Sequence, residues 1–303
     1  MNVMHQHDHA RGDRRLLALA LTVLAIFMVA EVVLGLVASS LALLADAGHM
    51  LTDAAALGLA LFAAWAAALP ARGRWTFGFA RAEILAAQAN GVTLLVIGLL
   101  IIYSAVRRLI DPPVVEGGIV AVVALVGIGV NFAVLTILSR ARRDSLNVRG
   151  AYLHVATDLL AFIATAVAGA LIVFTGWDRF DPVASLVVAG LMLGAAFTLL
   201  RESTLIFLEG APAAALPGDV GRAIAAHDGV VETHDLHVWT VTSGFPALSA
   251  HVLVRRDADC HRIREELEQM LHERFGVEHS TLQVEHVAEA TGLQIGSSAG
   301  ARS

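Results

Sequence analysis

Cysteine is almost absent from this sequence of 303 residues, in which Cys260 is the single one. One cysteine excludes a disulfide framework and a cysteine-rich zinc site within one chain. Charged residues are also scarce, at 16% of the chain, whereas 57% of the residues are hydrophobic and the mean hydropathy is +0.70. This apolar content exceeds what one soluble core needs, so we expect a membrane protein in which histidine and carboxylate side chains hold any metal ion.

No cleavable signal is apparent, because the first long apolar segment follows Arg14 and Arg15 and is too long for a signal peptide. Six apolar segments each provide the roughly 20 residues that a helix needs to cross the hydrocarbon layer. These segments are 16–38, 41–69, 83–106, 115–139, 147–176 and 182–208. The sequence therefore predicts an all-α transmembrane domain of six helices in a lipid bilayer.

The arginines indicate the orientation of these helices. Ten arginines lie before the first segment or in the loops after the second and fourth segments, and three lie in the loops on the opposite side. Because basic loops stay in the cytoplasm, and because six spans return the chain to its starting side, we expect both termini to be cytoplasmic.

The hydrophobic period changes after residues 210–212, where the sequence reads Gly-Ala-Pro. Segments 234–241, 248–254 and 281–287 alternate as strands do, and segments 218–226 and 259–275 have the pattern of amphipathic helices. The order α-β-β-α-β predicts a small α+β sandwich with one sheet face free to pair with a second copy. Residues 212–303 carry 7 basic and 13 acidic side chains, so this domain is expected to be soluble and acidic.

The sequence predicts four parts of the chain. They are a histidine-containing cytoplasmic arm (1–15), a six-helix transmembrane domain (16–208), a cytoplasmic domain (209–290) and a flexible tail (291–303).

Two pairs of ionisable residues lie inside the predicted membrane helices. His49 and Asp53 are four residues apart in the second segment, and His154 and Asp158 have the same spacing in the fifth. Residues i and i+4 share a helix face, and at about 1.5 Å per residue both pairs fall roughly 10–18 Å deep in antiparallel helices. Two imidazoles and two carboxylates supply the four ligands of a tetrahedral zinc site.

The charge of these four residues, the quartet of His49, Asp53, His154 and Asp158, is expected to couple the metal ion to protons. Two ionised carboxylates neutralise a divalent cation, so the loaded site is nearly neutral where net charge is most costly. In the empty site the carboxylates repel each other and are poorly solvated, so proton uptake is favoured. Metal and protons are therefore expected to compete for one site, which is the physical basis for antiport.

Other interpretations of these residues remain open. Each histidine or aspartate could hydrogen-bond to a neighbouring helix or face a water pocket, although the duplicated motif at matched depth favours ligands. Asp46 and Glu31 fit pathway or packing groups better than ligands.

At these residues the chain resembles the cation diffusion facilitator family, particularly its bacterial zinc-exporting members, over about residues 16–287. The motifs that carry the resemblance are SSLALLADAGHMLTD, FGFARAEILAAQANG (77–91), HVATD, IFLEGAP (206–212) and HDLHVW. The resemblance implies a homodimer in the bacterial inner membrane, with a metallochaperone-like cytoplasmic domain, that exchanges cytoplasmic zinc for protons by alternating access. It implies that residues 16–208 are the transport domain and that residues 209–290 are a metal-binding and dimerisation domain. It places the transport ligands at His49, Asp53, His154 and Asp158, and it implies no nucleic-acid partner.

The resemblance also implies a second metal site, where Zn²⁺ would be a structural or regulatory ion between cytoplasmic domains. The matching strands carry His234, His251 and Glu285, and His261 or His279 could complete that site. Gln283 stands where some relatives have a ligand histidine. The loop 70–82 contains no His, Asp or Cys for the membrane-surface site of other members.

Three further alternatives stay open for the function. The same transporter could carry mainly cadmium, cobalt, nickel or iron, because the ligand chemistry favours zinc without excluding these ions and affinity order alone gives little selectivity. An intramembrane metalloenzyme is disfavoured by the lack of a His-Glu-x-x-His motif, so we expect no enzyme. A passive channel would show metal flux that a pH gradient does not affect, and a sensor would bind metal without flux. The N-terminal His5, His7 and His9 could capture metal or have no role.

Overall fold

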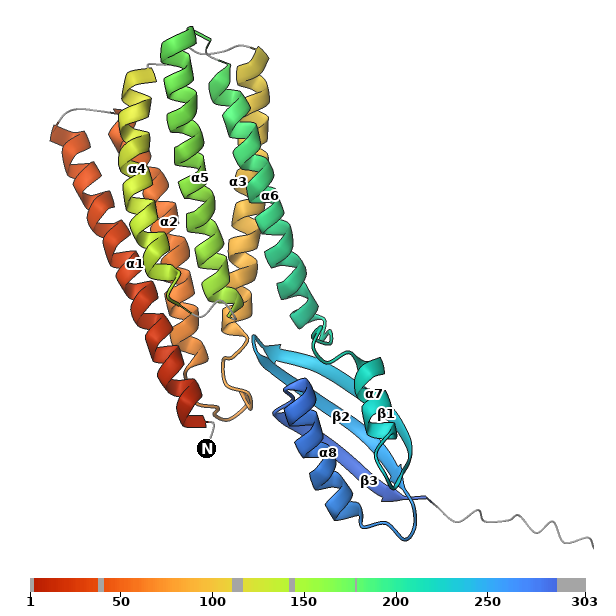
Figure 1. The fold of residues 1–303 in the computed structure, drawn as a ribbon. Helices are drawn as coiled ribbons and strands as arrows, with labels where there is room; N and C mark the ends of the chain where they lie inside the picture. Colours follow the sequence, from red (N-terminus) through yellow and green to blue (C-terminus); the bar gives the residue numbers. More distant parts are fainter. Residues whose placement is uncertain (1–2, 38–40, 111–116, 142–144, 178, 288–303) are drawn as a thin grey trace, which may run out of the picture. The chain divides into compact units, whose positions relative to one another are not determined.

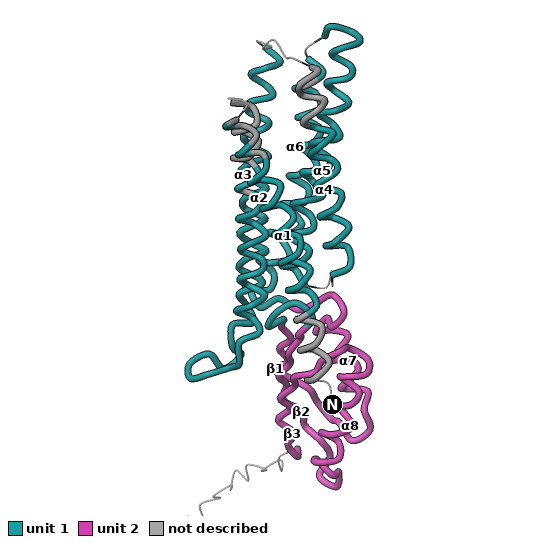
Figure 2. The backbone as a smooth tube through the Cα atoms, turned by 90° about the vertical axis from the view of Figure 1, so that its left-hand side faces the viewer, with its two compact units in different colours: residues 1–210, 240–244 teal, residues 211–239, 245–303 magenta. Residues whose placement is uncertain are grey.

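The computed structural model describes residues 3–37, 41–110, 117–141, 145–177 and 179–287. It forms two compact units (Figure 2). The first comprises residues 1–210 with 240–244, and the second comprises residues 211–239 with 245–303.

Six long helices form the first unit, and Figure 1 shows them side by side. They are α1 (Val3–Val37), α2 (Leu41–Ala67), α3 (Ala82–Ile110), α4 (Gly117–Leu138), α5 (Leu146–Thr175) and α6 (Phe180–Phe207). Helix α5 packs against α2, α3, α4 and α6. Its central position means that polar side chains on α5 can face several other helices.

The helices are apolar on the outside, as expected for a membrane domain. Within the described residues, Ala82–Ile110, Leu146–Thr175 and Pro182–Phe207 are long and apolar enough to cross a bilayer, and Asp53–Ala67 and Ala124–Leu138 form shorter apolar stretches. Large side chains such as Phe174 and Phe197 are 87% and 70% exposed, which suits contact with lipid rather than water. The prediction of a helical transmembrane domain is confirmed.

The first helix differs from its predicted bounds. Helix α1 begins at Val3, whereas the apolar pattern begins at about residue 16. A helix satisfies its backbone hydrogen bonds whatever its side chains are, so hydropathy marks the membrane-facing part of α1 and not its first residue.

Helix α5 is fixed at its start by side-chain contacts. The hydroxyl of Ser145 accepts a hydrogen bond from the backbone N–H of Val148 at 3.4 Å, which is the usual role of a serine N-cap. The same hydroxyl donates to Oε2 of Glu83 at 3.2 Å, in the first turn of α3. Nη1 of Arg149 lies 2.6 Å from Oε2 of Glu202 on α6. These contacts position the helix that carries His154 and Asp158.

The second unit has the predicted order of elements. They are α7 (Pro217–Ala225), β1 (Val230–Thr242), β2 (Phe245–Val254), α8 (Cys260–Phe275) and β3 (His279–His286). The sheet order is β1-β2-β3, and β2 pairs with β3 in parallel. The prediction of an α+β domain with the order α-β-β-α-β is confirmed.

The core of this unit lies between one face of the sheet and the two helices. Leu248 and Val252 on β2 belong to a buried cluster with Ile224 of α7 and with Ile263 and Leu267 of α8. Because side chains alternate along a strand, the residues between these core positions of β2 lie on the opposite face.

The first strand is longer than predicted. Strand β1 begins at Val230 instead of residue 234, and Asp235 within it has a φ of 51°. Aspartate tolerates this left-handed conformation better than most residues, because its short side chain can bond locally. The irregularity interrupts the alternation of side chains between the two faces of the sheet, on which the prediction of this strand partly rests.

Candidate metal centre

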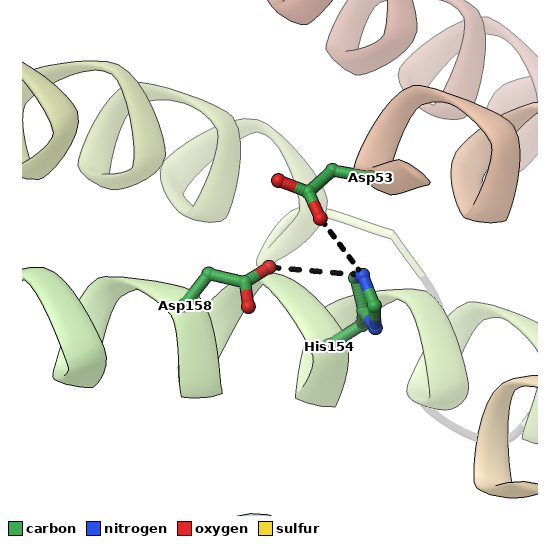
Figure 3. A group of neighbouring side chains, drawn as sticks. All are labelled: Asp53, His154 and Asp158. Atoms are coloured by element: carbon green, nitrogen blue, oxygen red, sulfur yellow. Dashed lines mark hydrogen bonds and ion pairs between the residues drawn. The ribbon is translucent and has the colours of Figure 1, made fainter. Parts of the chain in front are cut away.

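Three buried side chains of the first unit meet at one point (Figure 3). Nε2 of His154 lies 3.3 Å from Oδ1 of Asp53 and 3.7 Å from Oδ2 of Asp158. None of the three residues is more than 5% exposed. Within the part of the chain that the structure describes, they are the one group of three or more His, Cys, Asp or Glu residues close enough to hold a metal ion.

The helices bring these residues together in two ways. His154 and Asp158 lie one turn apart on α5, so the helical repeat alone places them on one face. Asp53 comes from α2, which packs against α5. The contact between the two helices therefore completes the site.

The two distances from the imidazole to the carboxylates are close to those of tetrahedral coordination. Metal–ligand bonds of about 2.0–2.1 Å at tetrahedral angles place the ligand atoms about 3.3–3.4 Å apart. The distances of 3.3 and 3.7 Å from Nε2 to the two carboxylates are close to this value. Small movements of the side chains would allow all three to bind one ion.

The charges of the site also suit a divalent cation. Two carboxylates and a neutral imidazole carry two negative charges, and a buried pair of carboxylates is costly without a cation or protons. Nδ1 of His154 has no hydrogen-bond partner among the described residues. The imidazole can therefore present Nε2 to an ion while Nδ1 remains available to a proton or to water.

The fourth predicted ligand, His49, lies on α2 one turn before Asp53. Its side chain lies outside the described residues, as do those of Asp46 and Glu31. The same holds for the side chains of His5, His7 and His9 in the N-terminal arm.

The second unit brings two of the predicted cytoplasmic ligands together. The rings of His234 on β1 and His251 on β2 lie with their centroids 5.4 Å apart. In the parallel pairing of β2 with β3, Gln283 is opposite His251 and Glu285 is opposite Leu253. Glu285 is therefore on the same sheet face as Gln283 and His251 and lies two register positions further along, where Gln283 donates a hydrogen bond to it.

The two optional ligands lie elsewhere. His279 is opposite Ala247, four register positions from the pair of His251 with Gln283, which is about 13 Å along the strands. His261 is exposed near the start of α8, and α8 packs on the other face of the sheet. Within one chain, neither lies beside His251.

Sequence reasoning missed an acidic group next to these histidines. Nε2 of His237 lies 2.9 Å from Oδ1 of Asp235, and this hydrogen bond holds the pKa of Asp235 below its ordinary value. His234 and His251 act on the same carboxylate in the same direction. The HDLH motif contained the signal, but the positive φ of Asp235 could not be anticipated from alternation.

Comparisons with known proteins agree with both units. The protein-family model of the cation efflux transmembrane domain matches residues 17–208. The family model of the cation efflux protein cytoplasmic domain matches residues 216–287.

Three curated relatives align along almost the whole chain. The metal cation efflux system protein CzcD of Cupriavidus metallidurans is 40% identical over 287 residues, covering 94% of this chain and 90% of that protein. The zinc transporter ZitB of Escherichia coli is 38% identical over 290 residues, covering 93% and 92%. A cadmium, cobalt and zinc/H(+)-K(+) antiporter of Bacillus velezensis is 38% identical over 289 residues, covering 94% and 92%.

Among solved structures, the metal-bound C-terminal domain of the CzcD transporter from the same Cupriavidus species matches at 38% identity. The match covers 22% of this chain and 94% of that chain, with a TM-score of 0.22.

Proposed function

The chain belongs to the cation diffusion facilitator family of divalent-cation efflux transporters, and we propose that it exports zinc from the cytoplasm in exchange for protons. The members of this family are transporters and not enzymes. The chain is accordingly a multi-pass membrane protein with a cytoplasmic C-terminal domain. We place it in the bacterial inner membrane with both termini in the cytoplasm.

One observation carries this proposal. Asp53, His154 and Asp158 are buried between α2 and α5 with ligand atoms near tetrahedral spacing. His49, one turn before Asp53, supplies the fourth ligand of the proposed quartet. A site built from four side chains of this kind has no open position for catalysis, which suits a cargo that must enter and leave intact.

Zinc is the proposed cargo because of the donors. Imidazole nitrogen and carboxylate oxygen in a tetrahedral arrangement suit zinc, whereas calcium and magnesium require six or more oxygen ligands. Cadmium, cobalt, nickel or iron as main cargo is the second candidate. The names of the relatives include zinc, cadmium and cobalt, so discrimination among these ions has to be measured.

Proton exchange follows from the same residues. The ligands must lose their protons before they bind zinc, and the empty carboxylates favour proton uptake in a medium of low dielectric constant. The same site can therefore bind either zinc or protons, and alternating access would carry zinc out of the cytoplasm and protons in.

We further propose that the cytoplasmic domain forms a homodimer that binds a regulatory zinc ion. His234, His251 and Glu285 lie on the sheet face that α7 and α8 leave uncovered, and Asp235 is a nearby carboxylate. A shared ion would offset the repulsion between two acidic domains. His261 and His279 could contribute only from a second copy.

Metal flux in proteoliposomes tests the proposed function. The full-length protein is supplied with zinc, cadmium, cobalt, nickel or iron, with and without a pH gradient across the membrane. We expect saturable zinc flux that a pH gradient accelerates. Zinc flux that ignores the gradient would indicate a channel, binding without flux would indicate a sensor, and faster flux of another ion would identify another cargo.

A further inference from the structure

Two buried amide side chains lie near the site without being part of it. Asn90 on α3 is 2% exposed and Asn147 on α5 is 0% exposed. Nδ2 of Asn90 and Oδ1 of Asn147 have no hydrogen-bond partner among the described residues. One atom is a donor and the other is an acceptor, and water can satisfy both kinds of group.

Both amides lie on the cytoplasmic side of His154. Helix α6 leads into the cytoplasmic domain, and the bond from Arg149 to Glu202 places the start of α5 beside the end of α6. Asn147 is the second residue of α5 and lies seven residues before His154, which is about 10 Å along the helix.

Asn90 lies between Asn147 and His154. A Cβ atom at Gly150 would be 3.5 Å from Nδ2 of Asn90, so Asn90 packs against the backbone of α5 at that level. Gly150 is three residues after Asn147 and four before His154, and these spacings place all three on one face of α5. Oδ1 of Asn147, Nδ2 of Asn90 and Nδ1 of His154, which have no hydrogen-bond partners among the described residues, therefore lie at three successive levels on or against this face of α5.

Asn147 also connects the two helices that hold the site. Its Nδ2 donates to the backbone oxygen of Ala60 on α2 at 2.7 Å. Ala60 is seven residues after Asp53, just as Asn147 is seven before His154. The amide of Asn147 thus lies at the same distance along the helices from Asp53 as from His154, and its oxygen remains available to accept a hydrogen bond from water.

We propose that Asn90 and Asn147 hold water on the cytoplasmic approach to His154 and form a polar step through which the cation and protons reach the site. This inference rests on the proposed function of the quartet. An ion that leaves the cytoplasm must exchange its hydration shell for the ligands, and a pair of amides that holds water lowers the barrier to that exchange. The amides are not ligands in the bound state, so they affect how fast zinc arrives and not how tightly it is held.

The test is the rate of zinc binding to the full-length protein in detergent, measured by stopped-flow mixing with zinc chloride and a zinc indicator. The kinetic phase of zinc binding that is absent from the Asp158→Asn variant is the one that belongs to the transport site. In Asn90→Leu and Asn147→Leu, which keep the branch at Cγ, are somewhat larger and remove the polar group, this phase should slow by about fivefold, the equivalent of one hydrogen bond. The equilibrium affinity of the site should stay within about twofold, since entry and exit slow together.

Two controls separate water binding from packing. Asn147→Ser loses the bond to Ala60 but keeps a polar group and leaves room for water, so it should bind zinc at close to the wild-type rate. Ser203→Ala removes a buried hydroxyl that donates to Leu199 of its own helix at 2.7 Å, and it should bind at the wild-type rate.

The outcomes distinguish the inference from the function on which it rests. Wild-type rates in both leucine variants would overturn the inference alone. Slow binding in Asn147→Ser, equal to that of Asn147→Leu, would also overturn it, because Asn147 would then act as a brace between α2 and α5. If the wild type has no phase that depends on Asp158, the proposed function fails and the inference fails with it.

Discussion

Nε2 of His154 lies 3.3 Å from Oδ1 of Asp53, although 101 residues separate them in the sequence. The contact joins α5 to α2 and buries an imidazole and a carboxylate in the membrane domain. Intramembrane ionisable groups are expensive, so a contact of this kind needs a functional reason. The proposed coordination of a transported cation would provide that reason.

Replacement of any one of His49, Asp53, His154 or Asp158 by alanine should abolish saturable zinc transport. Three remaining ligands leave the ion under-coordinated, while loss of one side chain should not prevent insertion. Zinc flux in proteoliposomes measures the effect, and membrane insertion and gel filtration confirm the fold. Full flux in two or more of these variants would contradict the assignment of the site.

Thr157 provides a matched control for these variants. It is 4% exposed and lies between the two ligands of α5, but its hydroxyl donates to the backbone oxygen of His154 at 2.7 Å. Thr157→Ala should keep saturable zinc transport, since the lost hydrogen bond is within one helix.

Much of this site could be predicted from the sequence, because spacing on a helix is a local property. The separation of four residues placed His154 and Asp158 on one face, and matched depth placed Asp53 opposite them. The bond from Asn147 to Ala60 could not be predicted, since the partner of a buried amide depends on how each helix is rotated about its axis. Hydropathy fixes that rotation poorly in a helix that is apolar on most sides.

The cytoplasmic domain, expressed as residues 212–290, should bind zinc and be dimeric or dimerise on binding. The triple variant His234→Ala, His251→Ala, Glu285→Ala should lose this binding, because it removes the ligands from the uncovered sheet face. Calorimetry and analytical ultracentrifugation check both effects. Unchanged zinc binding in the triple variant, or none in the wild type, would refute the regulatory site.

Leu267→Ala should destabilise the same domain by about 2–5 kcal/mol, the usual cost of a cavity in a packed core. Leu267 is 0% exposed and belongs to the cluster between α8 and the sheet. Chemical denaturation measures the change. Val231→Ala, at a position that is 56% exposed, is the control and should cost less than about 1 kcal/mol. Equal losses in the two variants would contradict the described core.

The stability of α8 should depend on pH through Asp259. Its carboxylate accepts hydrogen bonds from the backbone N–H groups of Arg262 and His261, and the bond from Arg262 contributes most to holding its pKa below the ordinary value. A depressed pKa stabilises the fold above the unfolded value of about 3.9 and loses that contribution as pH falls through the folded value. Asp259→Ala should therefore lower the melting temperature of the cytoplasmic domain clearly at pH 6 and much less at pH 3. A difference of the same size at both pH values would argue against this cap.

The sheet register of this domain was less predictable than its order of elements. Alternation placed His251 and Glu285 on one face, and the pairing of β2 with β3 agrees with that placement. Alternation could not predict the φ of 51° at Asp235, which depends on the local bonding of one short acidic side chain. The acidic group beside the histidines was missed for this reason.

The central claim is that zinc and protons compete for one buried group of side chains. Proton release on zinc binding tests it most directly, measured with a pH indicator in weakly buffered detergent solution between about pH 7.5 and 6. The wild type should release protons, with zinc affinity weakening as the pH falls, because each ligand must be deprotonated to bind. The double variant Asp53→Asn, Asp158→Asn should release far fewer. If the wild type releases none, or the double variant releases as many, zinc and protons do not compete at this site.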